Sequence, residues 1–146
     1  MSQIRQRAWT NLLVWGVAGI VLTVVFFAWG GPSEFAAESG RVAATAVALG
    51  LGYVVYFAVM WRTRGRGRVA SDERDELVVG RAGQAALVAV LLWVFAVGIG
   101  LWLAYDAAGA VPVGWMWFLA YATVIVGLVS HGAATLVLDA RLGGHG

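Results

Sequence analysis

The sequence predicts an all-α protein, an integral membrane four-helix bundle with up-down-up-down topology, and three observations support this prediction. Apolar residues make up 61% of the 146 residues and charged residues only 12%, whereas soluble domains carry about 25% charged residues. Four apolar runs are each long enough for a helix that crosses the bilayer core, which takes about 20 residues. Arginines are concentrated at the ends of alternate runs. The composition therefore excludes a soluble enzyme, a disulfide-stabilised secreted domain and a disordered chain.

The four apolar runs follow one another in a single transmembrane domain, residues 1–146. Because a backbone in lipid must satisfy its hydrogen bonds within its own segment, each run is predicted to be helical. Gly30, Gly31 and Pro32 end the first run and Pro112 follows the third, so these two connections predict antiparallel hairpins. The helices are expected at about 8–29, 42–61, 84–105 (with a helical start at 72) and 113–138, with a cytoplasmic loop at 62–81.

The distribution of arginine predicts how the chain is threaded through the membrane. All but one of the ten basic residues lie before the first helix, between the second and third, or after the fourth. The positive-inside rule then places both termini and the 62–81 loop in the cytoplasm and leaves only Arg41 outside. Four arginines are predicted to bind the anionic bilayer surface and to fix the topology: Arg62, Arg64, Arg66 and Arg68. No nucleic-acid partner is expected, because this run lacks interleaved aromatic residues.

The fourth run carries a candidate functional face. Thr123, Gly127, His131 and Thr135 recur every four residues, with Ser130 beside them, so they form a small and polar stripe on one side of the helix. His131 is an ionisable group inside a span, where such groups are costly and usually face other helices. Two interpretations stay open: a proton- or ligand-responsive site, or a neutral His that hydrogen-bonds across a helix seam. Ser130 and His131 point about 100° apart on a helix and form a poor nucleophile–base pair.

Small residues at four-residue spacing predict the seams along which the helices pack. Lipid tails are as apolar as Leu, so helices in a membrane associate where small residues allow close approach. The predicted seam residues are Ala44, Ala48 and Gly52 in the second run, and Ala82, Ala86, Ala96, Gly100 and Ala104 in the third.

A charged segment begins the third helix and carries the candidate interaction residues. They are Asp72, Glu73, Arg74, Asp75, Glu76 and, further along, Arg81. Acidic residues in a first turn complement the positive end of the helix dipole, and here they have arginines nearby for ion pairs. They are not expected to bind a metal ion, because consecutive helical side chains point in different directions.

The run from Asp72 to Glu76, followed by Gly80-Arg81-Ala82 and an apolar helix, resembles the charged signature of the membrane family named domain of unknown function 2178. That family consists of small prokaryotic proteins with about four predicted helices, similar to the layout here, and it has no established activity. The resemblance implies a multi-pass protein of a prokaryotic cytoplasmic (inner) membrane and no particular reaction.

The sequence contains no Cys or Lys, no acidic residue within a span, no phosphate-binding loop and no metal-type His spacing. No catalytic residue, cofactor or metal site is therefore predicted, and the chain is not expected to be an enzyme. The favoured function is an accessory or regulatory scaffold component that binds a protein partner through its charged cytoplasmic loop, within a homo-oligomer or a larger membrane complex. The alternative is a small transporter or channel subunit that uses the polar face of the fourth helix around His131.

Overall fold

The structure, a computed structural model, describes residues 3–28, 30–64 and 73–143. Within these ranges it is all-helical, without a strand. The elements are α1 (Gln3–Phe27), η1 (Pro32–Ala37), α2 (Ser39–Arg64), α3 (Glu73–Tyr105), η2 (Asp106–Ala108) and α4 (Val113–Gly143), where η marks a short 3-10 helix. In the part of the chain described, four helices are long and apolar enough to cross a membrane. The predictions of an all-α fold and of four candidate spans are confirmed.

The helices extend beyond their apolar runs at the ends that carry arginine. α1 begins at Gln3, and α2 continues to Arg64. Residues 62–64, predicted as loop, are helical, whereas the start of α3 at Glu73 agrees with the helical start predicted at 72. Apolarity marks the part of a helix that suits hydrocarbon, whereas backbone hydrogen bonding continues into the polar flanks.

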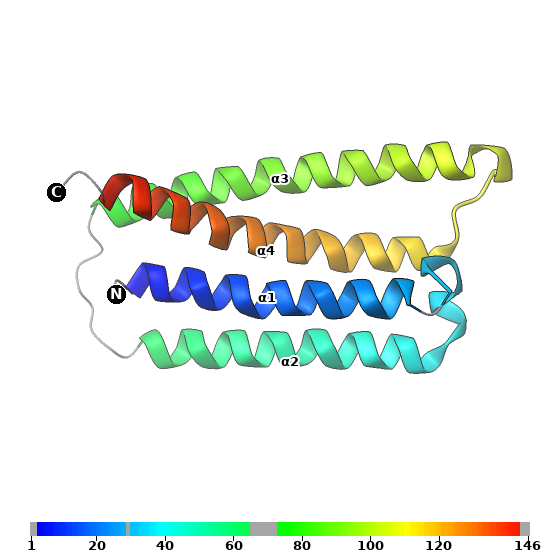
Figure 1. Cartoon of the computed structure of the whole chain (residues 1–146), viewed down its shortest axis with the longest axis horizontal. Helices are drawn as coiled ribbons and strands as arrows, with labels where there is room; N and C mark the ends of the chain where they lie inside the picture. Colours follow the sequence, from blue (N-terminus) through cyan, green and yellow to red (C-terminus); the bar gives the residue numbers. More distant parts are fainter. Residues whose placement is uncertain (1–2, 29, 65–72, 144–146) are drawn as a thin grey trace.

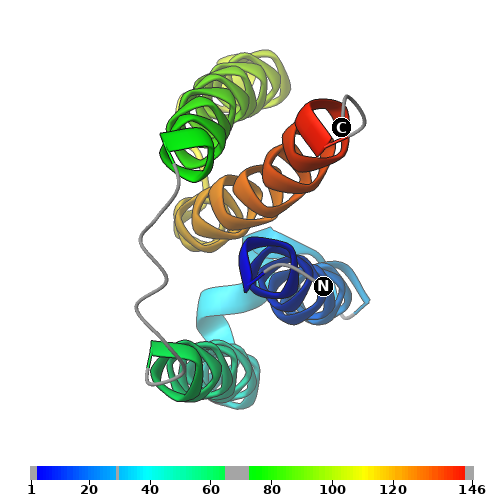
Figure 2. The same cartoon turned by 90° about the vertical axis from the view of Figure 1, so that its left-hand side faces the viewer.

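The four α-helices form a curved row rather than a closed ring. Figure 1 shows them in the order α3, α4, α1, α2, and the extensive helix–helix contacts join these successive neighbours. α2 and α3 lie at the two ends of the row, which leaves an open side between them in the end-on view of Figure 2. Both chain termini lie at one end of the molecule, the terminal end, and η1 and η2 lie at the other, the hairpin end (Figure 1).

The two turns at the hairpin end require glycine. Gly30 and Gly31 have φ of 92° and 79°, and Gly109, which ends η2, has φ of 68°. Side chains other than glycine rarely adopt these left-handed values. The glycines therefore stop the helices where the sequence predicted breaks.

Aromatic residues fill the core along α1. At the hairpin end the rings of Phe26 and Phe35 stack 4.0 Å apart, and Phe118 of α4 packs edge-on against Phe26. In the middle of α1, Trp15 is fully buried, and its ring packs against Tyr53 and Tyr56 of α2. α1 is therefore the helix that joins α2 to the rest of the molecule.

Arg41, the one arginine predicted outside, closes the end of α1. It is only 6% exposed, and its Nε donates a hydrogen bond to the carbonyl oxygen of Val25. Its Nη2 donates to the carbonyl oxygens of Phe26 and Gly31, 3.0 Å away in each case. The last carbonyls of a helix have no partner within the helix, so Arg41 supplies the missing donors. Glu38 lies 3.8 Å from Nε and balances the charge.

The predicted seam of α3 is confirmed in its first half and wrong in its second. Ala82 and Ala86 are buried, but Ala96, Gly100 and Ala104 are exposed. Ala96 follows Ala86 by ten residues, which places it about 80° away from the face of Ala86 on a helix, whereas Val97 returns to within about 20° of that face. Near the hairpin end, the partly buried positions lie one residue later, at Val97, Leu101 and Tyr105.

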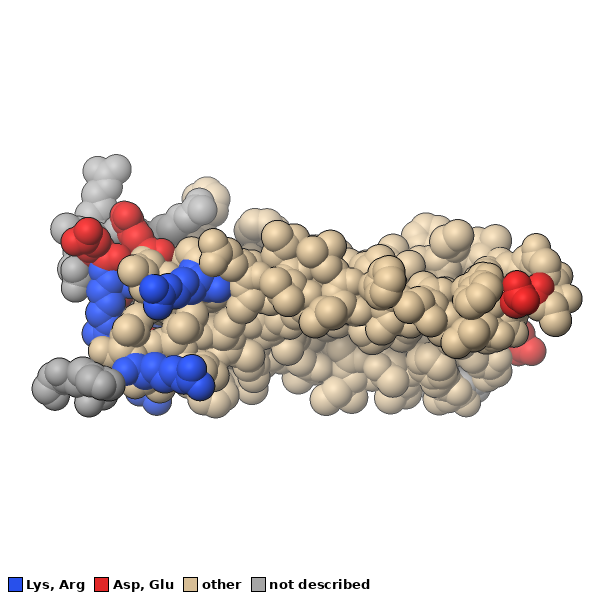
Figure 3. Space-filling view, turned by 90° about the horizontal axis from the view of Figure 1, so that it is seen from above, with Lys and Arg blue, Asp and Glu red and all other residues tan. Residues whose placement is uncertain are grey.

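Charged side chains lie at the two ends of the molecule. On the face seen in Figure 3, arginines gather at the terminal end, acidic residues lie at both ends, and the long middle carries neither. A bilayer core favours such a charge-free middle, because a charge placed there loses its hydration.

Candidate functional site

A pocket at the terminal end is lined by residues from all four helices, and we call it the four-helix pocket. Its volume is about 200 Å³. Its lining residues are Ile4, Arg7, Ala8 and Asn11 of α1, Tyr56 and Met60 of α2, Val79 of α3, and His131 and Thr135 of α4. The first and last helices of the chain thus contribute most of its polar groups.

Asn11 is a buried polar group of this pocket. It is only 6% exposed, and its Nδ2 donates a 2.7 Å hydrogen bond to the carbonyl oxygen of Leu128. A carbonyl only accepts, so this bond fixes which way the amide points. Asn11 Oδ1 is buried without a hydrogen-bond partner among the described residues. A buried acceptor left unpaired costs about 1–3 kcal/mol, so the pocket favours an occupant that carries a donor.

His131 lines the same pocket, one helical turn from Thr135. The Thr135 hydroxyl donates to the carbonyl oxygen of His131 at 2.8 Å, so its proton is used within α4. Tyr56 approaches from α2 and Arg7 from α1. The structure therefore brings an imidazole, a phenol, an amide and a guanidinium to one cavity.

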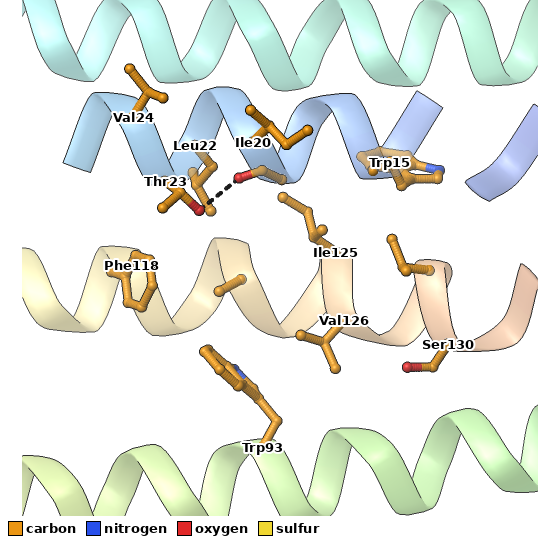
Figure 4. A pocket seen from close by; sticks show the side chains of 14 residues that line it. Trp15, Ile20, Leu22, Thr23, Val24, Trp93, Phe118, Ile125, Val126 and Ser130 are labelled. Carbon is orange, nitrogen blue, oxygen red and sulfur yellow. Dashed lines mark hydrogen bonds between the residues drawn. The ribbon is translucent and has the colours of Figure 1, made fainter. Parts of the chain in front are cut away.

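The rest of the predicted polar stripe on α4 lies elsewhere. Ser130 lines a different cavity of about 540 Å³ between α1, α4 and Trp93 of α3, which we call the tryptophan pocket; in Figure 4 its side chain points toward α3. The Thr123 hydroxyl donates to the carbonyl oxygen of Leu119 at 2.6 Å. Successive residues on a helix turn by about 100°, so only His131 and Thr135 of the stripe share the four-helix pocket.

Sequence reasoning assigned Arg7 to topology alone and did not select Asn11 as a site residue. The available signal was Asn11 itself, an amide inside an otherwise apolar run. Which residues of α1 and α2 face His131 depends on the rotation of each helix, and a single-helix pattern does not contain that information.

In the charged segment, an ion pair between Arg74 and Asp139 ties α3 to α4. Arg74 Nη2 lies 3.3 Å from the Asp139 carboxylate and also donates to the Asp139 carbonyl oxygen at 3.2 Å. Glu73, Glu76 and Arg81 are exposed. An ion pair at an exposed surface contributes at most about 1 kcal/mol to stability. Arg62 is exposed on α2, and Arg64 is the last residue of that helix. The predicted residues Arg66, Arg68 and Asp72 lie outside the described residues.

Among the described residues, no three His, Asp or Glu side chains come together to hold a metal ion. Comparison of the chain with protein-family models, with curated proteins and with solved structures finds no match. The resemblance to the domain of unknown function 2178 family therefore stays a prediction.

Proposed function

We propose that the chain is a multi-pass protein of a prokaryotic cytoplasmic membrane, threaded up-down-up-down with both termini in the cytoplasm. Four candidate spans and the arginines at the terminal end support this assignment. Arg41 is the one arginine on the other side, and its role as the cap of α1 explains its position there. The terminal end is then the cytoplasmic end.

Within that membrane, the protein is an accessory or regulatory component without catalytic chemistry, and it binds a small polar ligand in the four-helix pocket. The observation that carries this proposal is the buried, unpartnered Oδ1 of Asn11 beside His131. Ionisable and polar groups inside a membrane are costly, and they commonly mark functional sites. A convergence of such groups from three helices supports binding more than an isolated packing contact.

The shape of the core favours binding over conduction. Beyond Asn11, the same side of α1 carries Trp15, Leu22 and Phe26, all buried. The tryptophan pocket, which Trp15 and Leu22 line in this part of the molecule, is lined mostly by apolar residues. The geometry thus supports a ligand pocket open at one end more than the alternative of a transporter or channel subunit.

Mass spectrometry of the protein purified in its native lipid tests this proposal. A small molecule is expected to accompany the wild-type protein and to be lost from His131→Leu, because the leucine replaces a hydrogen-bonding group of the pocket by an apolar one. Ser130→Ala is the matched control, since Ser130 is the neighbouring residue and lines the tryptophan pocket. It is expected to retain the molecule.

Equal retention by both variants, or no such molecule on the wild-type protein, would contradict ligand binding at His131. Proteoliposomes provide the complementary measurement. Ion or solute flux that disappears in His131→Ala would favour the transporter or channel alternative.

A second candidate is the docking of a protein partner on the charged start of α3. Arg74 is paired with Asp139, whereas Glu73 and Asp75 make no ion pair with any described residue. Their carboxylates, at the positive end of the helix dipole, form an acidic surface suited to a basic partner.

Affinity capture in mild detergent tests this docking. A partner is expected to be captured by the wild-type chain and lost when Asp72, Glu73, Asp75 and Glu76 are replaced by their amides. Asp106→Asn at the hairpin end is the control for loss of a surface carboxylate and should retain the partner. An unchanged set of captured proteins would remove this candidate.

A further inference from the structure

We propose that the tryptophan pocket binds a lipophilic quinone, a flat and neutral molecule that carries two carbonyl oxygens. The proposal rests on the membrane assignment made above and not on the ligand of the four-helix pocket. Its basis is a set of unpaired indole donors in an uncharged, partly aromatic lining, at a depth that lipid headgroups do not reach.

Two indole groups of the tryptophan pocket lack a hydrogen-bond partner. Trp15 of α1 and Trp93 of α3 both line the pocket, and the Nε1 of each is buried without a partner among the described residues. Trp15 is fully buried, and Figure 4 shows Trp93 reaching from α3 toward α4. An indole N–H only donates, and a buried donor without an acceptor is costly. The pocket therefore favours an occupant that supplies acceptor oxygens.

The rest of the lining favours a neutral occupant. Its other polar side chains are two hydroxyls, those of Thr23 and Ser130, and none of the lining residues is charged. The Thr23 hydroxyl donates to the carbonyl oxygen of Gly19 at 2.9 Å, so its proton is used within α1 (Figure 4). A charged ligand would lose its hydration here without gaining an ionic partner. A carbonyl group accepts hydrogen bonds without carrying a charge.

The aromatic part of the lining favours a flat occupant. Trp93 and Phe118 pack edge-on, with ring centroids 6.3 Å apart, and both line the pocket. Aromatic rings attract a further ring in offset-stacked or edge-on arrangements. The volume of about 540 Å³ lies within the roughly 300–1,000 Å³ of ligand pockets. The pocket is therefore large enough for a ring system with its carbonyl groups.

Position separates a quinone from the ester groups of lipid. Trp15 lies near the middle of its candidate span, Ile4–Phe27, which is about 15 Å from either boundary of the hydrocarbon core. The ester carbonyls of phospholipids lie at that boundary. Ile20 and Val24 of the lining are also exposed on the surface of α1, so a molecule dissolved in the bilayer can enter from the side. A quinone dissolves in hydrocarbon and brings its carbonyl oxygens to this depth.

Isothermal titration calorimetry of the full chain in phosphatidylcholine nanodiscs tests the proposal, with empty nanodiscs as the reference. The probes are decylubiquinone, its quinol and decylbenzene. Decylubiquinone is expected to bind saturably, although the nanodisc lipid presents ester groups to every sample. Decylbenzene has a ring and a tail but no carbonyl, and it should bind about tenfold more weakly or less. The quinol should bind roughly three- to tenfold more weakly, because it brings donors to a wall whose unpaired groups are donors.

The decisive variants are Trp93→Phe and its control Trp102→Phe, which each remove one indole N–H from α3. Trp102 is 63% exposed and does not line the tryptophan pocket. Trp93→Phe keeps an aromatic ring and is expected to raise the Kd of decylubiquinone roughly three- to tenfold, the effect of losing one neutral hydrogen bond. The same variant should leave the Kd of decylbenzene within about twofold, as Trp102→Phe should for both probes. If Trp93→Phe fails to fold, the ranking of the three probes on the wild-type protein decides.

Several results would overturn the proposal. A quinol or decylbenzene that binds as tightly as decylubiquinone means that the pocket does not select carbonyl oxygens. Equal effects of Trp93→Phe and Trp102→Phe on decylubiquinone mean that Trp93 is not a donor to the ligand. A chain that enters nanodiscs but shows no saturable quinone binding removes the ligand class and leaves the membrane assignment intact. A chain that does not enter nanodiscs contradicts both.

Discussion

Replacing Arg41 by methionine is expected to lower the free energy of unfolding by about 3 kcal/mol or more, because hydrogen bonds to a charged donor contribute about 1.5–3 kcal/mol each. The substitution removes the donors of three carbonyl oxygens, those of Val25, Phe26 and Gly31, in a buried environment. For a chain of this length, the melting temperature Tm should fall by roughly 10 °C. Thermal unfolding of the protein in mild detergent, followed by circular dichroism, measures the change.

Arg62→Met is the control on the same helix, because the Arg62 side chain is exposed and its loss should shift Tm by no more than about 2 °C. Arg41→Lys should recover only part of the stability, since an ammonium lacks the planar fork that reaches several carbonyls. A Tm for Arg41→Met equal to that of the wild type would show that Arg41 does not act as the cap of α1.

Gly114→Ala is expected to destabilise the hairpin end by at least about 2 kcal/mol through overpacking. A Cβ at Gly114 would overlap the backbone carbonyl of Pro32 and approach the Cβ of Phe35 to 3.3 Å. The overlap involves backbone, so no side-chain rotation relieves it, and η1 must move away from α4. The fluorescence of Trp115, the next residue on α4, should change along with a fall in Tm of several degrees.

The matched control is Gly98→Ala on α3, where a Cβ meets nothing within 4 Å. Alanine is up to about 1 kcal/mol better than glycine inside a helix, so this variant should be as stable as the wild type or more so. If both variants shift Tm in the same direction and by a similar amount, close approach of η1 to Gly114 is not what stabilises the hairpin end.

The sequence predicted the features that depend on one segment at a time. Apolar length predicted the four helices, and glycine and proline predicted the two turns at Gly30 and Gly109. The open row could not be predicted, because all four helices are apolar around most of their surface and periodicity does not say which helices are neighbours. The seam of α3 passes through Val97 rather than Ala96, because only the former lies on the helix face that carries Ala82 and Ala86.

The candidate site was predicted only in its α4 part. His131 and Thr135 were selected from a periodic stripe, and they line one cavity. The stripe also included Ser130, which the rotation of α4 places in another cavity. Asn11 and Arg7 line the pocket because α1 packs against α4. A local sequence pattern cannot predict a contact between two helices so far apart in the chain.

The central position of α1 and α4 has a consequence for biogenesis. The ribosome makes α1 first and α4 last, yet these two helices are neighbours in the row. More than a hundred residues are synthesised after Asn11 before the Leu128 carbonyl exists to accept the hydrogen bond of its amide. The pocket is therefore complete only once α4 has been synthesised and has packed against α1.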